Sequence, residues 1–149
     1  MRMLKVEFVK LNEKAVVPTY GSACAAGADL YALIDNDKQT IAPHQTVIIH
    51  TGIALAIPDG YAGMIFARSG IALKRGLAPA NKVGVIDSDY RGEIMVAIHN
   101  HSDEEKEIAN GERIAQLVIM PYLAAEFCEC SSLDTTQRND GGFGSTGTK

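Results

Sequence analysis

The sequence predicts an all-β domain, and three observations support this fold class. The apolar segments are short, and their periodicity is nearer to two residues than to 3.6. The 14 glycines and five prolines supply turn residues between these segments. Only residues 69–74 have a locally helical pattern. With 149 residues, of which 46% are apolar, the chain has the length and the core material for one compact domain and not for two.

The first predicted strands are separated by clear turn signals. Residues 4–8 alternate between apolar and charged side chains, which is typical of a strand with one face toward solvent. The apolar segments 47–49 and 53–57 lie on either side of Gly52, where we expect a bend or a bulge. Residues 58–60, Pro-Asp-Gly, then predict a turn, because proline fixes φ and glycine accepts a positive φ.

Three longer strands follow this turn. The apolar patterns cover residues 61–67, 93–99 and 113–120, and the Asn-Gly pair at 110–111 predicts a turn before the last of them. No unit of about 20 to 50 residues repeats, which excludes solenoids and propellers.

Charge and cysteine content narrow the class of protein. The chain has 14 basic and 18 acidic residues, a net charge of −4, which argues against a surface that binds nucleic acid. The longest charge-free segment, residues 39–58, is interrupted by proline and polar residues, so we expect no membrane span. Charged residues near the N-terminus do not fit a signal peptide. The cysteines, Cys24, Cys128 and Cys130, are odd in number and do not fit a disulfide framework, so we expect a cytoplasmic protein.

The C-terminal end differs in composition from the rest of the chain. Four of the last nine residues are glycine, and Phe143 is the only large apolar residue after Leu133. Such a segment cannot bury enough apolar surface to become ordered alone. It is either a frayed terminus or an arm that becomes ordered on a ligand. Its amides and hydroxyls suit a phosphate, Arg138 adds a positive charge, and Phe143 adds a flat aromatic face.

The densest polar segment is residues 87–93, Asp-Ser-Asp-Tyr-Arg-Gly-Glu. It lies between the apolar segments 83–86 and 94–98, a pattern that predicts a hairpin with an acidic tip. Asp87 and Asp89 are separated by one residue, so they could bind a hard cation, or one of them could activate a water molecule as a general base. The alternative is a solvated turn with no chemical role.

Residues 68–70, Arg-Ser-Gly, directly follow a predicted strand and begin the helical segment. A helix N-terminus presents unpaired N–H groups and a partial positive charge. The Arg68 guanidinium, the Ser69 hydroxyl and the Gly70 amide therefore form a candidate phosphate site. The alternative is that Ser69 serves only as the N-cap of the helix.

Two polar side chains interrupt predicted apolar strands. Asp29 has apolar neighbours on both sides, so its carboxylate needs a specific partner, either an arginine or a metal-bound water. Gln116 lies within the apolar strand 113–120, where its amide could donate to a phosphate oxygen or be satisfied by the backbone of the core. For both residues the sequence leaves the two alternatives open.

Taken together and in this order, these segments resemble the homotrimeric deoxyuridine triphosphate pyrophosphatase (dUTPase) family across nearly the whole chain. The segments that carry the resemblance are residues 26–31, 68–70, 81–93, 111–117 and 138–147. The third and the fifth of these are the most specific. Ala28 departs from the family pattern, which commonly has a larger residue before the aspartate, but Asp29 itself is present.

The resemblance implies hydrolysis of dUTP to dUMP and pyrophosphate, which would limit uracil in DNA and supply dUMP for dTMP synthesis. It implies Mg²⁺ as the cofactor, held mainly by the triphosphate, with Asp29 orienting water around the metal. Asp87 would hold and deprotonate the water that attacks the α-phosphorus in line. Residues 68–70 would bind the phosphates, and Gln116 would support the network of phosphate and metal-bound water.

The same resemblance implies a nucleoside pocket and a closing arm. The uracil edge would be read by Asn81, Gly84, Val85, Ile86 and Met95. Tyr90 would pack under the deoxyribose and exclude a 2′-hydroxyl. Phe143 would stack on the uracil when the arm closes, and Arg138 would reach the γ-phosphate. Gly144 and Ser145 would also contact the substrate.

The subunit implied by the resemblance is all-β and jelly-roll-like (β-clip), with one short helix, and it assembles as a homotrimer with shared active sites. One subunit would supply the first, second and fourth segments, a neighbour the third, and the remaining subunit the tail. We expect a single β-rich domain over residues 1–134 and a flexible arm over 135–149 that closes over an active site. The expected partners are dUTP and two further copies of the chain, with no nucleic acid and no membrane.

Two alternative functions are open: a different reaction catalysed by a related family, and a regulatory role from another functional class. The related dCTP deaminase family shares the fold and an Arg-Ser-Gly segment but lacks the glycine-rich arm, so residues 138–147 and the pair Asp89-Tyr90 argue against it. The second alternative is a regulatory module that senses nucleotides through protein contacts. The sequence contains no added segment that supports such a role.

Overall fold

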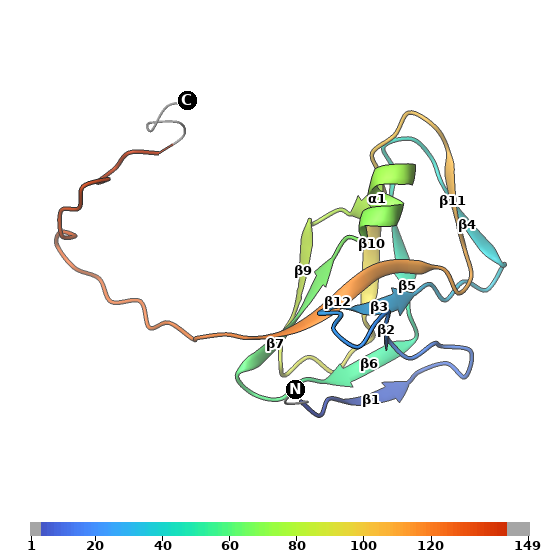
Figure 1. Cartoon of the computed structure of the whole chain (residues 1–149), viewed down its shortest axis with the longest axis horizontal. Helices are drawn as coiled ribbons and strands as arrows, with labels where there is room; N and C mark the ends of the chain where they lie inside the picture. The colour runs from blue at the N-terminus through green and yellow to red at the C-terminus, as the bar shows by residue number, and fades with distance from the viewer. Residues whose placement is uncertain (1–3, 143–149) are drawn as a thin grey trace.

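The computed structural model describes residues 4–142, and almost all of its elements are strands (Figure 1). The strands are β1 (Glu7–Lys10), β2 (Thr19–Tyr20), β3 (Ala28–Tyr31), β4 (Lys38–Ile41), β5 (Thr46–His50), β6 (Ile53–Ala56), β7 (Tyr61–Phe66), β8 (Leu77–Pro79), β9 (Val83–Ile86), β10 (Met95–Asn100), β11 (Lys106–Ala109) and β12 (Arg113–Pro121). The helix is α1 (Ser69–Arg75), and it follows β7. The all-β prediction and the short helical segment are confirmed.

Antiparallel sheets organise the described strands. The largest sheet has the order β2-β3-β12-β7-β9, and a second has the order β5-β10-β8. The pairs β1-β6 and β11-β4 complete the set. β12 pairs with β3 on one side and with β7 on the other, so it holds the centre of the largest sheet. Short antiparallel strands in several sheets around one core are the architecture expected of a jelly-roll-like subunit.

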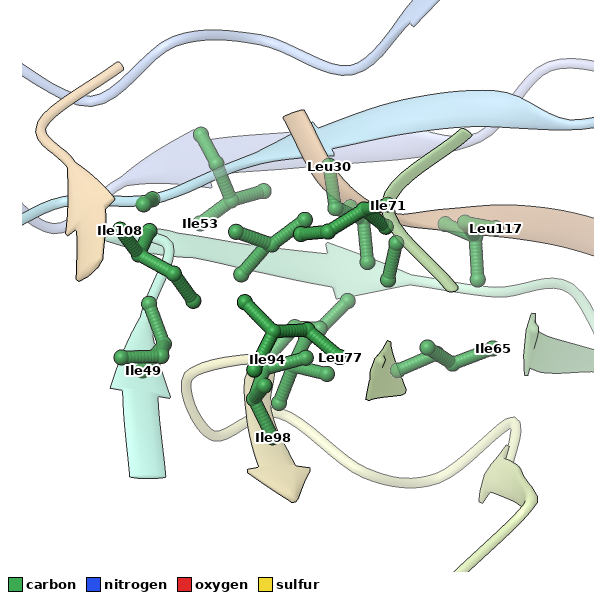
Figure 2. Close-up of a cluster of buried hydrophobic side chains, with 14 of the residues drawn as sticks. Leu30, Ile49, Ile53, Ile65, Ile71, Leu77, Ile94, Ile98, Ile108 and Leu117 are labelled. Atoms are coloured by element: carbon green, nitrogen blue, oxygen red, sulfur yellow. The ribbon is translucent and has the colours of Figure 1, made fainter. Parts of the chain in front are cut away.

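The core is aliphatic and draws on every sheet. Figure 2 shows Leu30 of β3, Ile53 of β6, Ile98 of β10 and Ile108 of β11 converging on one interior. Asn100 and Thr51 are fully buried polar side chains among the described residues, and the Asn100 amide donates to the carbonyls of Ile41 at 3.0 Å and Glu104 at 2.8 Å. This interior fixes β3, β7 and β12, the strands that carry most of the site described below.

Most predicted strands and turns lie close to their expected positions. β5 and β6 flank Gly52, which has a φ of +67°. A side chain at Gly52 would also lie 2.7 Å from a Leu33 methyl carbon, so both the backbone conformation and the space require glycine. The turn at 58–60 is closed by a hydrogen bond from the Tyr61 amide to the Pro58 carbonyl at 3.2 Å.

The N-terminal strand differs from its prediction. β1 begins at Glu7 instead of residue 4, and all of its residues are exposed, with Phe8 at 46% and Val9 at 57%. β1 pairs with β6 alone among the described strands. The apolar face expected for residues 4–8 is therefore only partly covered in the single chain, because Val6 packs against the core whereas Leu4 and Phe8 are exposed. Alternation reports which side chains are apolar and not what covers them.

The predicted hairpin with an acidic tip is wrong. β9 pairs with β7, whereas β10 pairs with β5 and β8, so the two strands belong to different sheets. Residues 87–94 cross from one sheet to the other, and we call them the crossover segment. A pattern of alternating apolar residues identifies a strand but not its pairing partner, which explains the error.

The end of the described chain leaves the sheets. After β12 ends at Pro121, residues 122–142 contain no helix or strand, and Figure 1 shows this segment running away from the body. Its exposed large apolar side chains are Tyr122, Leu123, Phe127 and Leu133. The predicted arm, 135–149, is described only as far as Gly142. Within residues 4–142, no helix has the length and apolar character needed to cross a membrane.

Candidate active site

A cavity of about 230 Å³ lies beside the central strand β12. Its lining residues are Gly21, Ala25, Gly27, Asp29, Arg68, Ser69, Gly70, Arg113 and Gln116. Three of the segments singled out from the sequence therefore meet in one place. We call this cavity the anion pocket, for the cationic and N–H groups described below. A larger cavity of about 540 Å³, lined by residues of β1, β6 and the crossover segment, contains none of the predicted site residues.

The register of the largest sheet explains why these side chains meet. Gln116 on β12 is paired with Asp29 on β3 and with Phe66 on β7. Residues paired across neighbouring strands have their side chains on the same face of the sheet. Arg68 follows Phe66 by two residues, at the point where β7 ends and α1 begins. The carboxylate, the amide and the guanidinium are thus brought together by strand pairing.

Two arginines hold Asp29. This residue is only 8% exposed. Its Oδ1 accepts a hydrogen bond from Nε of Arg68 at 2.6 Å, and its Oδ2 accepts one from Nη1 of Arg113 at 3.2 Å. Of the two partners expected for this carboxylate, the structure therefore contains arginine. Two guanidinium groups around one carboxylate leave a net positive charge, which favours an anionic ligand.

Arg113 is the site residue that the sequence analysis missed. It precedes Gln116 by three positions, and in a regular strand that spacing puts two side chains on opposite faces. The pairing of β12 with β3 shifts register between Arg113 and Ala115, and this β-bulge returns Arg113 to the face of Gln116. The adjacent residues Ile114 and Ala115 are both fully buried, and this apolar pair is the one sequence signal that could have indicated the bulge.

The start of α1 offers donors that the chain itself does not use. The first helical hydrogen bond runs from the Ala72 amide to the Arg68 carbonyl at 3.0 Å, so the amides at positions 69–71 have no acceptor within the helix. The helix has no side-chain cap, so the alternative of Ser69 as an N-cap is wrong. Ser69 is the first helical residue and is exposed. The space in front of Gly70 is open, with no atom within 4 Å of an added Cβ.

Gln116 is held by the backbone and lines the pocket at the same time. Its Nε2 donates to the Ala67 carbonyl at 2.9 Å, which satisfies the amide nitrogen as the alternative for this residue anticipated. Its Oε1 lies against Gly27, where an added Cβ would come within 2.6 Å of it. The absence of a side chain at Gly27 therefore leaves room for the Gln116 side chain at this edge of the anion pocket. A phosphate-binding role for Gln116 stays a prediction.

The residues expected to bind the nucleoside lie on and around β9, the crossover segment and β10. The Asn81 amide nitrogen packs over Gly84, 3.5 Å from the position of an added Cβ. The Tyr90 hydroxyl donates to the Glu93 carbonyl at 2.9 Å, and its ring covers Gly92 so closely that an added Cβ would lie 2.4 Å from the hydroxyl. The exposed residues of this set include Val85 at 59%, Met95 at 42% and Tyr90 at 41%.

Asp87 and the anion pocket are far apart within one chain. Ile86 on β9 is paired with Gly63 near the start of β7, whereas Arg68 follows the end of β7. If this register continues, Asp87 lies level with residue 62 of β7, and Arg68 follows residue 62 by six positions. Six positions correspond to about 20 Å of extended strand. The Asp87 carboxylate is exposed and forms no ion pair with any residue in 4–142. One protomer therefore does not bring the predicted general base to the predicted phosphate site.

Glu93 anchors the end of the crossover segment. Its Oε2 bonds Nδ1 of His50 at 2.8 Å, and its Oε1 accepts from the Gly52 amide at 2.8 Å. Burial raises the pKa of Glu93, but the hydrogen bonds from His50 and Gly52, with the charge of His50, outweigh burial and lower the pKa below its ordinary value of 4.5. The ionised carboxylate thus ties the segment to the bend between β5 and β6.

The predicted arm residues are only partly described. Arg138 is exposed, and its Nε donates to the carbonyl of Gly141 at 2.9 Å. It does not line the anion pocket. Phe143, Gly144 and Ser145 lie outside the described residues.

The described part of the chain offers no direct metal site. No group of three or more His, Cys, Asp or Glu side chains in residues 4–142 is placed to hold a metal ion. Each oxygen of Asp29 already accepts a bond from an arginine, but a carboxylate oxygen has a further lone pair that a water molecule could use. The cysteines Cys24, Cys128 and Cys130 are free and exposed.

The chain is similar to known proteins of one family. The dUTPase family profile matches residues 13–147. A deoxyuridine 5′-triphosphate nucleotidohydrolase of Hydrogenobaculum sp. is 49% identical over 146 residues, which cover 98% of this chain and 100% of the relative. A mutant dUTPase of Staphylococcus bacteriophage 80alpha with dUpNHpp has a TM-score of 0.87 at 26% identity, covering 97% of this chain and 99% of that one. A mutant dUTPase from phage phi11 of S. aureus, described with a structural Mg(II) ion, has a TM-score of 0.77 at 24% identity, covering 87% and 98%.

Proposed function

This chain belongs to the dUTPase family and is a dUTP nucleotidohydrolase, and on this premise we propose how its residues hydrolyse dUTP to dUMP and pyrophosphate. The anion pocket carries the proposal. Three family segments there place two guanidinium groups, a free hydroxyl and unpaired amides around one space. A triphosphate carries several negative charges, and charge-assisted bonds from such donors bind it more strongly than neutral ones.

Arg68, Ser69 and Gly70 bind the phosphates in this proposal. The bond from Nε of Arg68 to Asp29 fixes the plane of the guanidinium, and Nη1 also donates to the Arg113 carbonyl at 3.5 Å. The other N–H groups of Arg68 are available to a ligand at the pocket. The Ser69 hydroxyl and the amides at the start of α1 add donors that need no rearrangement. Gln116 supports the same network from β12.

Asp87 is the general base. Its carboxylate is exposed and has no ion-pair partner in residues 4–142, so it is free to accept a proton. The attacking water gives its proton to Asp87 as its oxygen bonds the α-phosphorus. The bond from this phosphorus to the bridging oxygen breaks on the opposite side, and pyrophosphate leaves with that oxygen.

Assembly completes the site. Asp87 and Arg68 lie about 20 Å apart along one edge of the sheet, a distance too long for both to act on one α-phosphate. A homotrimer in which the anion pocket of one subunit faces the crossover segment of the next removes this difficulty. The exposed apolar residues of β9, β10 and the segment after β12 are consistent with such contacts.

A Mg²⁺ ion held by the triphosphate fits the residues that are present. The described residues contain no direct ligand set, and Asp29 retains lone pairs for a metal-bound water. The ion supplies neutralisation of the triphosphate charge when bound.

The nucleoside and the arm complete the proposal. Asn81, Gly84, Val85, Ile86 and Met95 read the uracil edge, and the Tyr90 ring, held over Gly92, excludes a 2′-hydroxyl. Residues 135–149 close over the site, with Phe143 on the uracil and Arg138, Gly144 and Ser145 at the phosphates. The cytoplasmic reaction would keep uracil out of DNA and supply dUMP for dTMP synthesis.

The test is the release of pyrophosphate from dUTP, dCTP, dTTP and UTP, each measured with and without EDTA. We expect release from dUTP alone, and loss of that release with EDTA. Equal release from all four nucleotides would contradict the proposed nucleoside pocket. Full activity in EDTA would contradict the proposed requirement for Mg²⁺. Ammonia release from dCTP would point instead to the deaminase reaction.

A further inference from the structure

We propose that Arg113 binds the polyphosphate of the substrate as a second guanidinium beside Arg68, and that Asp29 positions both arginines for this task. This inference rests on the proposed function, because it names a further ligand-binding residue of the same site. The proposed function counts the Arg113 guanidinium among the cationic groups of the pocket but gives Arg113 no task of its own. The anion pocket, the bulge in β12 and the charge balance around Asp29 support it independently.

The bulge places Arg113 in the pocket. Without the register shift between Arg113 and Ala115, the side chains of Arg113 and Gln116 would lie on opposite faces of β12. Both line the anion pocket instead. A bulge interrupts the ladder of hydrogen bonds, and bulges are frequent next to active sites, where they redirect one side chain. The redirected side chain here is a cation.

The charge balance gives Arg113 a function beyond pairing. One arginine is enough to neutralise Asp29, and Arg68 already does so through its Nε at 2.6 Å. With Arg68 alone the buried pair would be neutral and a poor attractant for a triphosphate. The second guanidinium makes the group of three net positive. The bond from Arg113 to Asp29 is also the longer of the two, at 3.2 Å.

Exposure and donor count leave Arg113 free to bind a ligand. Its side chain is 52% exposed, compared with 25% for Arg68 and 11% for Asp29. A guanidinium has five N–H donors. Nη1 of Arg113 bonds Asp29, and it is the one donor of this side chain that has a partner among residues 4–142. The other N–H groups remain for phosphate oxygens, while Asp29 restricts the orientation of the plane.

Binding affinity tests this role. The probes are inorganic tripolyphosphate and the analogue dUpNHpp, titrated by calorimetry into the full chain and into R113Q and R113K. We expect R113Q to weaken both ligands by about tenfold or more, because a charge-assisted bond is lost. R113K keeps the charge but not the planar fork, so we expect a loss of about threefold to tenfold. Unchanged affinity in R113K and R113Q would overturn the proposal, and R113K alone decides it if R113Q does not fold.

A double-mutant comparison separates ligand binding from neutralisation of Asp29. If Arg113 served only to neutralise Asp29, R113Q would have no further effect once Asp29→Asn has removed the charge. We expect R113Q to weaken tripolyphosphate in the D29N background as well. Arg75 gives the matched control. It pairs with Glu112, which directly precedes Arg113 in the chain, and it does not line the pocket. R75Q should leave both affinities unchanged.

The same titrations distinguish failure of this inference from failure of the proposed function. A chain that does not hydrolyse dUTP but binds tripolyphosphate through Arg113 would refute the function and keep the anion site. A chain that hydrolyses dUTP with the same Michaelis constant in R113Q would keep the function and refute the inference.

Discussion

The anion pocket and the crossover segment differ in how much of their geometry a single chain provides. In the pocket, three strands of one sheet and two ion pairs fix Asp29, Arg68 and Arg113. In the crossover segment, Tyr90 is held by a local hydrogen bond and Asp87 is exposed without an ion pair among the described residues. Under the proposed function, the phosphate-binding groups are therefore placed within one subunit, whereas the chemistry requires an assembled and liganded state.

The largest expected effect comes from the crossover segment. Asp87→Asn should lower kcat by roughly 1,000-fold, because a neutral amide cannot accept the proton of the attacking water. The affinity for dUpNHpp should stay within about twofold, because the phosphate donors lie in the separate anion pocket. Steady-state kinetics and calorimetry measure the two quantities. A kcat near that of the wild type would remove Asp87 from the role of base.

Mixing two inactive variants tests whether the two regions meet between subunits. Arg68→Gln disables the anion pocket and Asp87→Asn disables the crossover segment. If each site takes these regions from different subunits, unfolding and refolding an equimolar mixture should restore about a quarter of wild-type activity, the random-assembly fraction of sites with both regions intact. The separately refolded variants are the controls. No recovery in a mixture shown to form mixed oligomers would place both regions in one chain.

Removal of the C-terminal segment should have the next largest effect. Deleting residues 138–149 removes Arg138 and the aromatic ring of Phe143, so we expect roughly 100-fold lower kcat/KM for dUTP from the lost charge-assisted and stacking contacts. Residues 138–142 are mostly exposed, so thermal unfolding and sedimentation should be unchanged. A truncated chain that unfolds or dissociates would give the segment a structural role.

The smallest expected effect concerns the stability of the crossover anchor. The folded-state pKa of Glu93 is below 4.5, so this carboxylate stabilises the fold above about pH 4.5, and the contribution is lost as the pH falls through the lower folded-state value. Glu93→Gln removes that contribution. We therefore expect the free energy of unfolding to fall less steeply below pH 4.5 in E93Q than in the wild type, as measured by urea unfolding at several pH values. Parallel curves would contradict this assignment.

Much of the fold followed from local patterns. The alternation of apolar residues located most strands, and the glycine at 52 marked a real bend with positive φ. The pairing of the strands could not be predicted in this way, because alternation does not indicate which strand lies next to which. This is why residues 83–98 looked like a hairpin although β9 and β10 belong to different sheets.

The candidate site was predicted to a similar extent. Asp29, Arg68 and Gln116 stood out because polar groups in apolar strands need partners, and strand pairing brings them together. Arg113 did not stand out, because its spacing from Gln116 assigns it to the other face of a regular strand. The distance between Asp87 and the pocket is a property of register, which composition and motifs do not report.

The bulge in β12 has a consequence for how this site is encoded. It adds one residue to β12 that has no partner on β3. The face on which Arg113 lies therefore depends on the number of residues before Gln116 as well as on their identity. At the present length, a regular ladder without the bulge would turn the Arg113 guanidinium to the opposite face, although every polar residue of the pocket would still be in the sequence. Deleting Ile114 would instead place Arg113 two positions before Gln116, a spacing that keeps both side chains on one face without a bulge. In this strand, insertions and deletions matter to the chemistry as much as substitutions do.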